Sequence, residues 1–409
     1  MDFIKKNKKV LLTITAVIVL VGFTVAIMLI FSRAKNTEEE TEVPRATTGQ
    51  ITLQTTELVT EAVTEEITEE LTEVQTATID EPVTEEETTT ETAKKTTSDP
   101  SKYFREDIED KEKPLLLISS ASVDIVKGEA FDIHKYIGYA DDADRDVELK
   151  ITGEVDTNTV GSYDISYSLK DDVGNETTGN MKVNVVASAP PASGEAPQRT
   201  PFSDFKTKYG GDNVSLGIDV SRWDGNIDFQ KVKDAGCDFV IMRLGGYDDG
   251  ELYTDRCYLQ NIKNAKDAGL KIGIYWHAEE SSYDEVKASV KYLLDVLDGE
   301  KLDFPIAYDW EDFGNFESYG MNLQDINDCY HVFEEELGAA GYDVCLYSSK
   351  NFLLNTWKDR GDTMVWLAHY TSNTDFTGDY FMWQQTSTGG MDGIDHNVDF
   401  NVLYNNQNN

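Results

Sequence analysis

Two carboxylates stand one residue apart at the end of an apolar stretch, in IAYDWED at residues 306–312. Such a pair, Asp309 and Glu311, with no Cys/His ligand set beside it, indicates glycoside hydrolysis. In that chemistry one carboxyl group protonates the leaving oxygen and another charged group supports an oxocarbenium-like centre. Two further acids, Asp219 in LGIDVS and Asp399 in HNVDFN, lie in similar stretches. The four acids are the candidate catalytic residues.

A second set of side chains could bind a sugar beside these acids. Flat rings stack on pyranose faces, while hydroxyl and amide groups fix the orientation of a ligand. The alternative for any one of the aromatic residues is a place in the core. The candidate substrate-binding residues are Tyr275, Tyr347, Trp366, Tyr370 and Gln384.

Other chemistries fit the sequence less well. Four carboxylates could hold a hard cation, but the histidines are scattered and neither HxH nor HExxH occurs. A serine hydrolase is disfavoured because GxSxG is absent. We therefore expect no metal at this site and no cofactor.

The elements that must position these residues lie between 213 and 405. Helical stretches such as YDEVKASVKYLLDVLD alternate there with strands. Such alternation is typical of parallel strands joined by crossovers, and eight strands predict an irregular β/α barrel with about five helices. The expected strands are SLGIDVSR, FVIMRLGG, KIGIYWHA, FPIAYDWE, YDVCLYSS, MVWLAHY, FMWQQTS and HNVDFNVL.

Strand parity predicts which side chains face the barrel interior. Side chains alternate between the two faces of a strand. Ile306, Tyr308 and Trp310 therefore oppose Asp309 and Glu311. The apolar set should meet the helices, and the acidic set should point inward at the open mouth. The first and last strands divide in the same way, so all four acids should meet at one rim.

The N-terminal part predicts a membrane-anchored protein. Residues 10–31 form an apolar run of the length that crosses a bilayer, after a basic tail at 1–9. The positive-inside bias places that tail in the cytoplasm and the rest of the chain outside. The alternative, a cleaved signal peptide, has a shorter apolar region. A net charge of -40 argues against nucleic acid as a partner.

Three segments should separate the span from the barrel. Residues 32–103 repeat Thr-Glu and predict a disordered stalk, with an amphipathic helix as the alternative. Short β-rich runs over 104–187 predict a small all-β sandwich without catalytic residue types. Residues 188–212, which include SAPPASGEAPQRTP, should be a linker.

The order of motifs resembles glycoside hydrolase family 25. The resemblance extends from about Val214 to Tyr404 and rests on LGIDVSRWDGNIDF, KIGIYWHA, FPIAYDWED, LYSS, VWLAHY and WQQTSTGGMDGIDHNVDFN. It implies an irregular eight-stranded barrel and N-acetylmuramidase (lysozyme) activity. It also implies that Glu311 is the general acid, with Asp309 as its partner and Asp219 and Asp399 as the other acids. The five substrate-binding candidates lie in motifs of the saccharide groove or next to them. The sandwich resembles bacterial immunoglobulin-like spacer domains.

The nearest competing pattern is the D-x-x-D-x-D-x-E signature of family 18 chitinases. It requires acids at positions occupied here by Phe304 and Ala307. We therefore expect a wall-facing hydrolase that cuts the β-1,4 bond between N-acetylmuramic acid and N-acetylglucosamine for cell-wall remodelling. Its partners would be peptidoglycan glycan strands and, through the N-terminal helix, the cell membrane. The alternatives are a non-catalytic wall-binding protein and a scaffold built around the sandwich. Spacing in the sequence leaves retention and inversion open.

Overall fold

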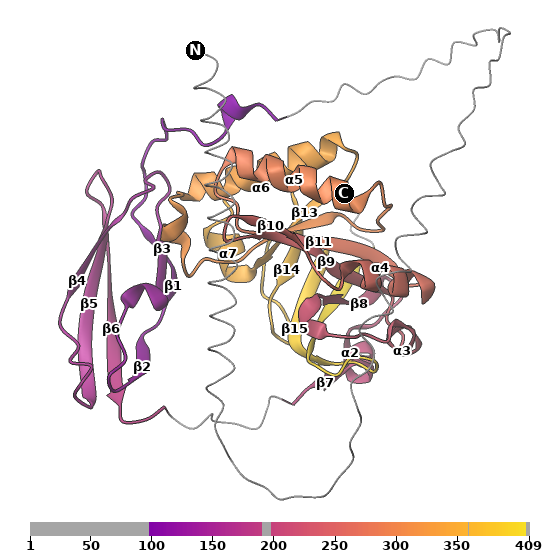
Figure 1. The fold of residues 1–409 in the computed structure, drawn as a ribbon, viewed down its shortest axis with the longest axis horizontal. Coiled ribbons are helices and arrows are strands. Elements are labelled where there is room, and N and C mark those ends of the chain that lie inside the picture. The colour runs from indigo at the N-terminus through magenta and orange to yellow at the C-terminus, as the bar shows by residue number, and fades with distance from the viewer. Residues whose placement is uncertain (1–97, 190–197, 359, 406–409) are drawn as a thin grey trace, which may run out of the picture. The chain divides into compact units, whose positions relative to one another are not determined.

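The computed structural model describes residues 98–189, 198–358 and 360–405 (Figure 1). The basic tail, the expected membrane span at 10–31 and the Thr/Glu repeats up to residue 97 lie outside the described residues. Within the described ranges, no helix combines the length and hydropathy needed to cross a bilayer.

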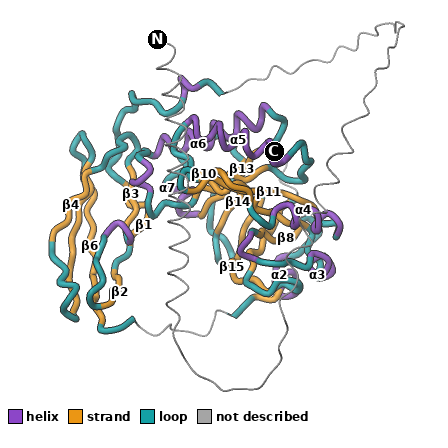
Figure 2. Tube along the Cα trace, viewed as in Figure 1, coloured by secondary structure: helices purple, strands orange, loops and turns teal. Residues whose placement is uncertain are grey.

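The first described domain is built almost entirely from strands, with one short 3-10 helix at Ile133–Lys135 (Figure 2). One sheet pairs β1 (Leu115–Ser119) with β3 (Ile137–Ala140). The other has the order β2-β6-β5-β4, from β2 (Ser122–Val126), β4 (Glu148–Thr152), β5 (Gly161–Lys170) and β6 (Glu176–Val186). Alternate residues of β5 and β6, including Leu169 and Val183, are buried in one core. The predicted all-β domain is confirmed, although the sequence analysis missed β3.

The second domain is a closed barrel. Its strands pair in the order β9-β11-β12-β13-β14-β15-β16-β8, and β8 also pairs with β9, which closes the ring. Each predicted strand is present: β8 (Val214–Val220), β9 (Phe239–Asp248), β11 (Lys271–Ala278), β12 (Ile306–Trp310), β13 (Val344–Ser349), β14 (Met364–Ala368), β15 (Met382–Gly390) and β16 (Val398–Tyr404). A short strand, β10 (Glu251–Thr254), extends β9 as a hairpin. The predicted eight-stranded barrel is confirmed.

One strand of the barrel runs against the others. β16 is antiparallel to both of its neighbours, β15 and β8. The parallel arrangement that strand–helix alternation predicts therefore does not extend to β16. The reason is the connection: β15 ends at Gly390 and β16 begins at Val398, which is too short for a crossover helix.

Helices cover the outside of the barrel. They are α3 (Phe229–Asp234), α4 (Tyr258–Asp267), α5 (Tyr283–Leu297), α6 (Leu323–Ala339) and α7 (Lys350–Asn355). In α5, Val286, Val290, Leu293 and Leu297 recur at helical spacing and are buried. Side-chain bonds from Ser282 and Asn322 cap the first turns of α5 and α6.

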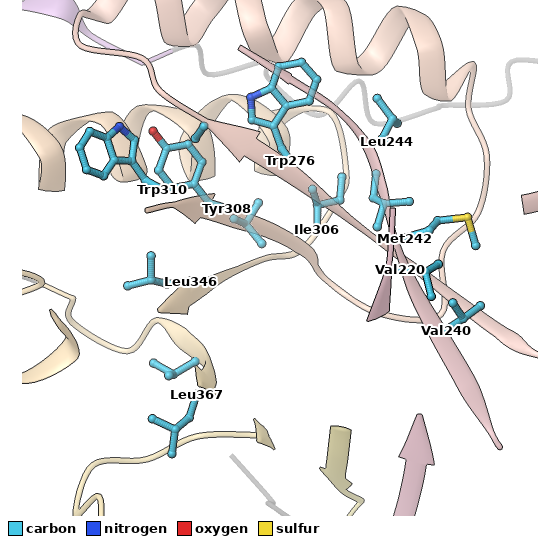
Figure 3. Packing of buried hydrophobic residues seen from close by; sticks show 14 of the residues in the cluster. Val220, Val240, Met242, Leu244, Trp276, Ile306, Tyr308, Trp310, Leu346 and Leu367 are labelled. Carbon is cyan, nitrogen blue, oxygen red and sulfur yellow. The ribbon is translucent and has the colours of Figure 1, made fainter. Parts of the chain in front are cut away.

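The outward faces of the strands supply the other half of this core. Ile306, Tyr308 and Trp310 of β12 are fully buried in it. Figure 3 shows them beside Trp276 of β11, on the helix side of the sheet. A separate apolar cluster, which includes Ile241, Ala307 and Cys345, fills the interior. Strand parity therefore predicted the direction of β12 correctly.

The interior cluster needs one position without a side chain. Phe239 of β9 lies beside Gly217 of β8, where an added Cβ atom would come within 2.4 Å of the Phe239 ring. The small residue thus allows the aromatic ring to fill the barrel below the polar rim.

The linker predicted at 188–212 is too long. Thr200 and Pro201 form β7 (Thr200–Pro201), which pairs with β15, and α2 (Phe202–Tyr209) follows directly. Phe202 and Phe205 are buried against Phe400 of β16, with ring centroids 5.2 and 4.8 Å away. The pattern FSDFKTKY is short and polar enough to resemble a linker, but its two Phe residues belong to the barrel core.

The end of the predicted stalk is also ordered. Ser98 is buried, and its backbone N–H donates to Glu336 of α6 at 2.7 Å. Tyr103 stacks on Tyr283 of α5, with centroids 6.5 Å apart. Residues 98–103 therefore pack on the helices rather than continuing the stalk.

We predict that Phe205→Ala lowers the free energy of unfolding by about 3–5 kcal/mol, the usual effect of deleting a buried aromatic ring. Denaturant unfolding would measure the change. Leu259→Ala, at a position that is 69% exposed on α4, is the matched control and should change stability little. If both substitutions had equally small effects, α2 would not belong to the barrel core and the predicted linker would be correct.

Candidate active site

The four acids lie at the mouth of the barrel. Asp219 is near the carboxyl end of β8, Asp309 is near the end of β12, and Glu311 follows that strand directly. Asp399 is the second residue of β16 and faces Asp219 in the antiparallel register. Because β16 runs backwards, its beginning lies at the rim where the parallel strands end. All four acids line one cavity of about 220 Å³.

The predicted sugar-binding residues line the same cavity. The structure thus places all nine candidates together, although their roles in binding and catalysis remain predictions. The residues around the cavity are Asp219, Tyr275, Asp309, Glu311, Tyr347, Trp366, Tyr370, Gln384, Ser387 and Asp399.

A hydrogen-bond network fixes Asp219. The Gln384 amide nitrogen donates to both oxygens of Asp219, at 3.2 and 3.0 Å, and the Asn401 amide donates to Oδ2 at 2.6 Å. Tyr347 and Tyr370 donate their hydroxyl protons to the Gln384 oxygen at 2.8 and 2.9 Å. Two amides and two phenols therefore orient one buried carboxylate.

Asp309 has a different environment. It is 7% exposed, and its Oδ1 accepts no hydrogen bond within the protein. Buried polar oxygens are normally paired, so Oδ1 of Asp309 is an acceptor that the protein itself does not use. The fixed Asp219 and the unpaired Asp309 thus differ in what they can offer a substrate.

Glu311 lies where the site opens. It lines both the 220 Å³ cavity and a wider one of about 550 Å³, as do Tyr347 and Tyr370. The wider cavity continues past Lys350 and Asn351 of α7 and His369. A carboxyl group at the junction of two adjoining cavities can reach a bond that joins two sugar units.

Burial and mutual repulsion raise the pKa of the acids. Desolvation is the main cause, and it lifts the pKa of Asp219 to about 7 although Asn401 and Gln384 bond to the charged form. Desolvation and the charge of Asp219 lift the pKa of Asp399 to about 9. The pKa of Asp309 is raised by desolvation and then by Glu311 and Asp219. Each carboxyl group in this cavity is therefore shifted toward its protonated form.

The pKa of Glu311 is raised as well, and desolvation is again the cause. Its side chain is exposed toward the wider cavity, while neighbouring residues shield its other sides from solvent. A raised pKa keeps a glutamic acid protonated at a pH where a free glutamate has lost its proton. Glu311 can therefore serve as a proton donor.

We predict that Asp399→Asn stabilises the barrel at pH 8. A carboxyl group whose pKa is higher in the folded than in the unfolded state stabilises fully below the unfolded value, near 4. That stabilisation is lost as the pH rises toward the folded value, here about 9. The amide removes this loss, so the thermal midpoint should rise by at least about 2 °C at pH 8 and much less at pH 4.

Thermal unfolding at pH 4, 6 and 8 would measure this dependence. Asp392→Asn, at an exposed position before β16, is the control and should leave the midpoint unchanged. A gain that is equal at all three pH values would show that the pKa of Asp399 is not raised.

Two of the aromatic candidates are buried too deeply to stack on a sugar. Trp366 is 2% exposed and Tyr347 is 6% exposed, and their rings contact each other edge to face at 4.7 Å. Trp366 instead donates its indole N–H to Asn401 at 2.8 Å. These two rings line the cavity but offer little exposed face for stacking, and their role in substrate binding stays a prediction. Tyr370 is 58% exposed and does offer a ring face.

The sequence analysis missed three residues of the site. Asn401 holds Asp219, and its place on the inward face of β16 was the available clue. Arg243, the one charged residue in FVIMRLGG, is buried with Asp255 at 2.8 Å and opposes the rise in the pKa of Asp309. Asp224 follows β8 and adds negative charge near Asp219. Asn401 and Arg243 were overlooked because each lies within a strand whose sequence indicates a structural role.

The described residues contain two groups of acids with the spacing of a metal site. Both lie in the sandwich, and neither includes an acid of the barrel cavity.

An irregular β/α barrel with acids at the carboxyl ends of its strands is the arrangement of a barrel glycosidase. The comparisons agree with this class. Residues 218–394 match the family model of "Glycosyl hydrolases family 25", and residues 116–185 match that of "Bacterial surface protein, Ig-like domain". The barrel and the sandwich are thus each similar to a known domain family over most of their length.

The chain is also similar in sequence to two proteins named as lysozymes. The autolytic lysozyme of Clostridium acetobutylicum is 28% identical over 45% of this chain and 54% of its own length. Lysozyme M1 of Streptomyces globisporus is 26% identical over 45% of this chain and 66% of its own. This chain thus spans about half of the first lysozyme and two thirds of the second.

A solved structure of similar shape is the family 25 glycosyl hydrolase from Bacillus anthracis. It is 19% identical, with a TM-score of 0.43, over 52% of this chain and 96% of that chain.

Proposed function

We propose that this protein is a peptidoglycan hydrolase that cuts the β-1,4 bond between N-acetylmuramic acid and N-acetylglucosamine. The observation that supports it most is the pairing of Asp309 and Glu311 in one cavity. Asp309 has an unpaired buried oxygen, and Glu311 has a raised pKa at the junction with a second cavity. One acid can thus contact the sugar at the reacting centre while the other contacts the leaving oxygen.

The 2-acetamido group of the muramic sugar takes part in the proposed mechanism. Its oxygen attacks the anomeric carbon as the glycosidic bond breaks, and Glu311 gives its proton to the leaving oxygen. Asp309 accepts a hydrogen bond from the acetamide N–H and stabilises the positive charge that develops. Water then opens the cyclic intermediate and returns a proton to Glu311, so the product retains its configuration.

Digestion of purified peptidoglycan by the protein would test the proposal. Mass spectrometry of the muropeptides should find N-acetylmuramic acid at the new reducing ends. Proton NMR of the first product should show retained β-configuration. Reducing ends on N-acetylglucosamine would overturn the bond assignment, and an inverted product would overturn acetamide participation.

We also propose that the enzyme is anchored in the cell membrane and acts on the wall of the producing bacterium. The support is in the sequence: an apolar run at 10–31, a basic tail before it and a Thr/Glu-rich segment after it. An acidic, self-repelling tether would let the barrel reach nearby glycan strands. Membrane fractionation with an antibody to the barrel should find the full-length chain in the membrane. A shortened, soluble form would overturn the anchor.

A further inference from the structure

Five aspartates gather in the sandwich domain, outside the proposed active site. Asp110 precedes β1, three more follow β3, and Asp171 follows β5. Taking one carboxylate oxygen from each residue, they form two groups of three in which these oxygens lie within 4.8 Å of one another. One group is Asp110, Asp144 and Asp171, and the other is Asp110, Asp141 and Asp142. Asp110 belongs to both groups, so the five residues form one aspartate cluster.

The buried oxygens of this cluster lack protein partners. Asp141 is fully buried and Asp171 is 4% exposed, yet Oδ2 of each accepts no hydrogen bond. Neither oxygen of Asp110 has a partner. Buried carboxylate oxygens are normally paired, because removal from water without a partner is costly. The cluster therefore presents four acceptor oxygens that the sandwich itself leaves unused.

No cation of the described chain neutralises the cluster. None of its five aspartates forms an ion pair with a lysine, arginine or histidine among the described residues. Arg145, the neighbour of Asp144 in sequence, pairs instead with Asp325 and Glu106. Up to five negative charges thus remain together without a counter-charge.

Backbone hydrogen bonds hold the acids in place by their other oxygens. Oδ1 of Asp141 accepts from the N–H groups of Ala143 and Asp144, both at 3.0 Å. Oδ1 of Asp171 accepts from Gly174 and Asn175, at 2.6 and 2.7 Å. Asp141 and Asp171 therefore each use one oxygen to fix their own turn, and the other oxygen of each has no partner.

The electrostatic effect of this crowding falls on Asp110. Desolvation, and then the charges of Asp141, Asp171, Asp144 and Asp142, raise the pKa of Asp110 to about 6. The pKa of Asp141 is raised as well, mainly by burial. Without a cation, the charged cluster repels itself at neutral pH.

We propose that the aspartate cluster binds Ca²⁺, with Asp110 as its central ligand. Calcium takes six to eight oxygen ligands at about 2.3–2.6 Å, so oxygens within 4.8 Å of one another can surround one ion. Mg²⁺ demands stricter geometry and is usually bound through only one or two carboxylates. Zinc and other transition metals favour His or Cys ligands, and the cluster has neither.

Calcium should stabilise the sandwich because its ligands come from three separate segments of the chain. A ligand that binds only the folded state raises the unfolding midpoint. For a domain of this size, calcium at about ten times its dissociation constant should raise the midpoint by about 5–10 °C.

Full-length protein stripped of metal with EDTA would test the proposal. Calorimetric titration with CaCl₂ should show binding, and thermal unfolding should shift upward with CaCl₂ but much less with MgCl₂. The absence of both binding heat and a calcium-dependent shift would overturn the proposal. An equal shift with magnesium would overturn the choice of calcium.

Asp110→Asn gives the sharpest variant because its two expected effects have opposite signs. The amide should abolish the calcium-dependent shift, yet in EDTA it should raise the midpoint above that of the unchanged protein by relieving repulsion. A calcium shift that persists in this variant would contradict the central role of Asp110. Asp144→Asn, at a half-buried position of the same cluster, provides a second test if the first variant does not fold.

Asp164→Asn is the matched control. Asp164 lies in β5 of the same domain, its side chain is 84% exposed, and it pairs with Lys182. Its amide variant removes one negative charge from the sandwich without touching the cluster. The calcium-dependent shift should therefore be unchanged, and its loss would point to a general charge effect instead of a site.

Discussion

Replacement of Glu311 by Gln should lower the rate at which the protein releases reducing ends from peptidoglycan by about 10²–10⁴-fold, the usual contribution of a general acid. Glutamine keeps the size of the side chain but has no acidic proton for the leaving oxygen. The raised pKa of Glu311 extends to higher pH the range in which the side chain carries that proton. The pH profile of the unchanged protein should also show the role of Glu311, because activity should fall as the pH rises through the raised pKa of this residue.

Glu251→Gln provides the control for this experiment. Glu251 lies in β10 on an exposed position and lines neither of the two adjoining cavities. Its variant should keep full activity and bind peptidoglycan normally. Equal release by the unchanged protein and Glu311→Gln would overturn the assignment of the acid. No release by the unchanged protein would favour the non-catalytic wall-binding protein.

Strand parity made the inward acids predictable. In β12 the alternation of apolar and acidic residues has one consistent solution, because Tyr308 and Trp310 need the helix layer and Asp309 needs the open interior. The structure agrees in detail: the first two are fully buried among the helices, and the acid lines the cavity. When alternate residues of a strand are clearly apolar, the sequence alone shows which side chains face the core, even if the neighbouring strands are unknown.

The position of Asp399 was predicted for an incomplete reason. In a strictly parallel barrel, a residue at the start of the last strand would lie at the opposite rim from Asp309. The reversal of β16 brings Asp399 to the mouth and sets it opposite Asp219. Strand direction depends on the length of the preceding connection, and the eight strands alone do not show it.

The hydrogen-bond partners of the site residues could not be predicted from the sequence. Trp366 has the parity of a groove residue, but its indole N–H is used by Asn401, which in turn holds Asp219. Such pairing depends on the register of neighbouring strands, and register is a tertiary property. The aspartate cluster was missed for the same reason, because Asp110, Asp141 and Asp171 are far apart in sequence and meet only in the folded sandwich.

The second large effect should come from Asp309→Asn. This substitution should lower the turnover rate by about 10²–10³-fold, the range found when one preorganised electrostatic contact to a transition state is removed. The unpaired Oδ1 of Asp309 is the acceptor available for the acetamide N–H, and the carboxylate charge opposes the positive charge on the sugar. An amide is neutral, and an NH₂ group turned toward the substrate cannot accept that hydrogen bond. Initial rates on purified peptidoglycan would measure the loss.

The neighbouring residue in the same strand supplies the control, and it tests strand parity as well. Tyr308 is fully buried on the helix side of β12, where its hydroxyl makes one long contact of 3.4 Å to Glu280. Tyr308→Phe should therefore keep its turnover rate within a few-fold of the unchanged protein, whatever small loss of stability it brings. A large loss in Tyr308→Phe with normal folding would contradict the assignment of the two faces. Full activity of Asp309→Asn would remove Asp309 from the mechanism and leave Glu311 to act with another of the inward acids.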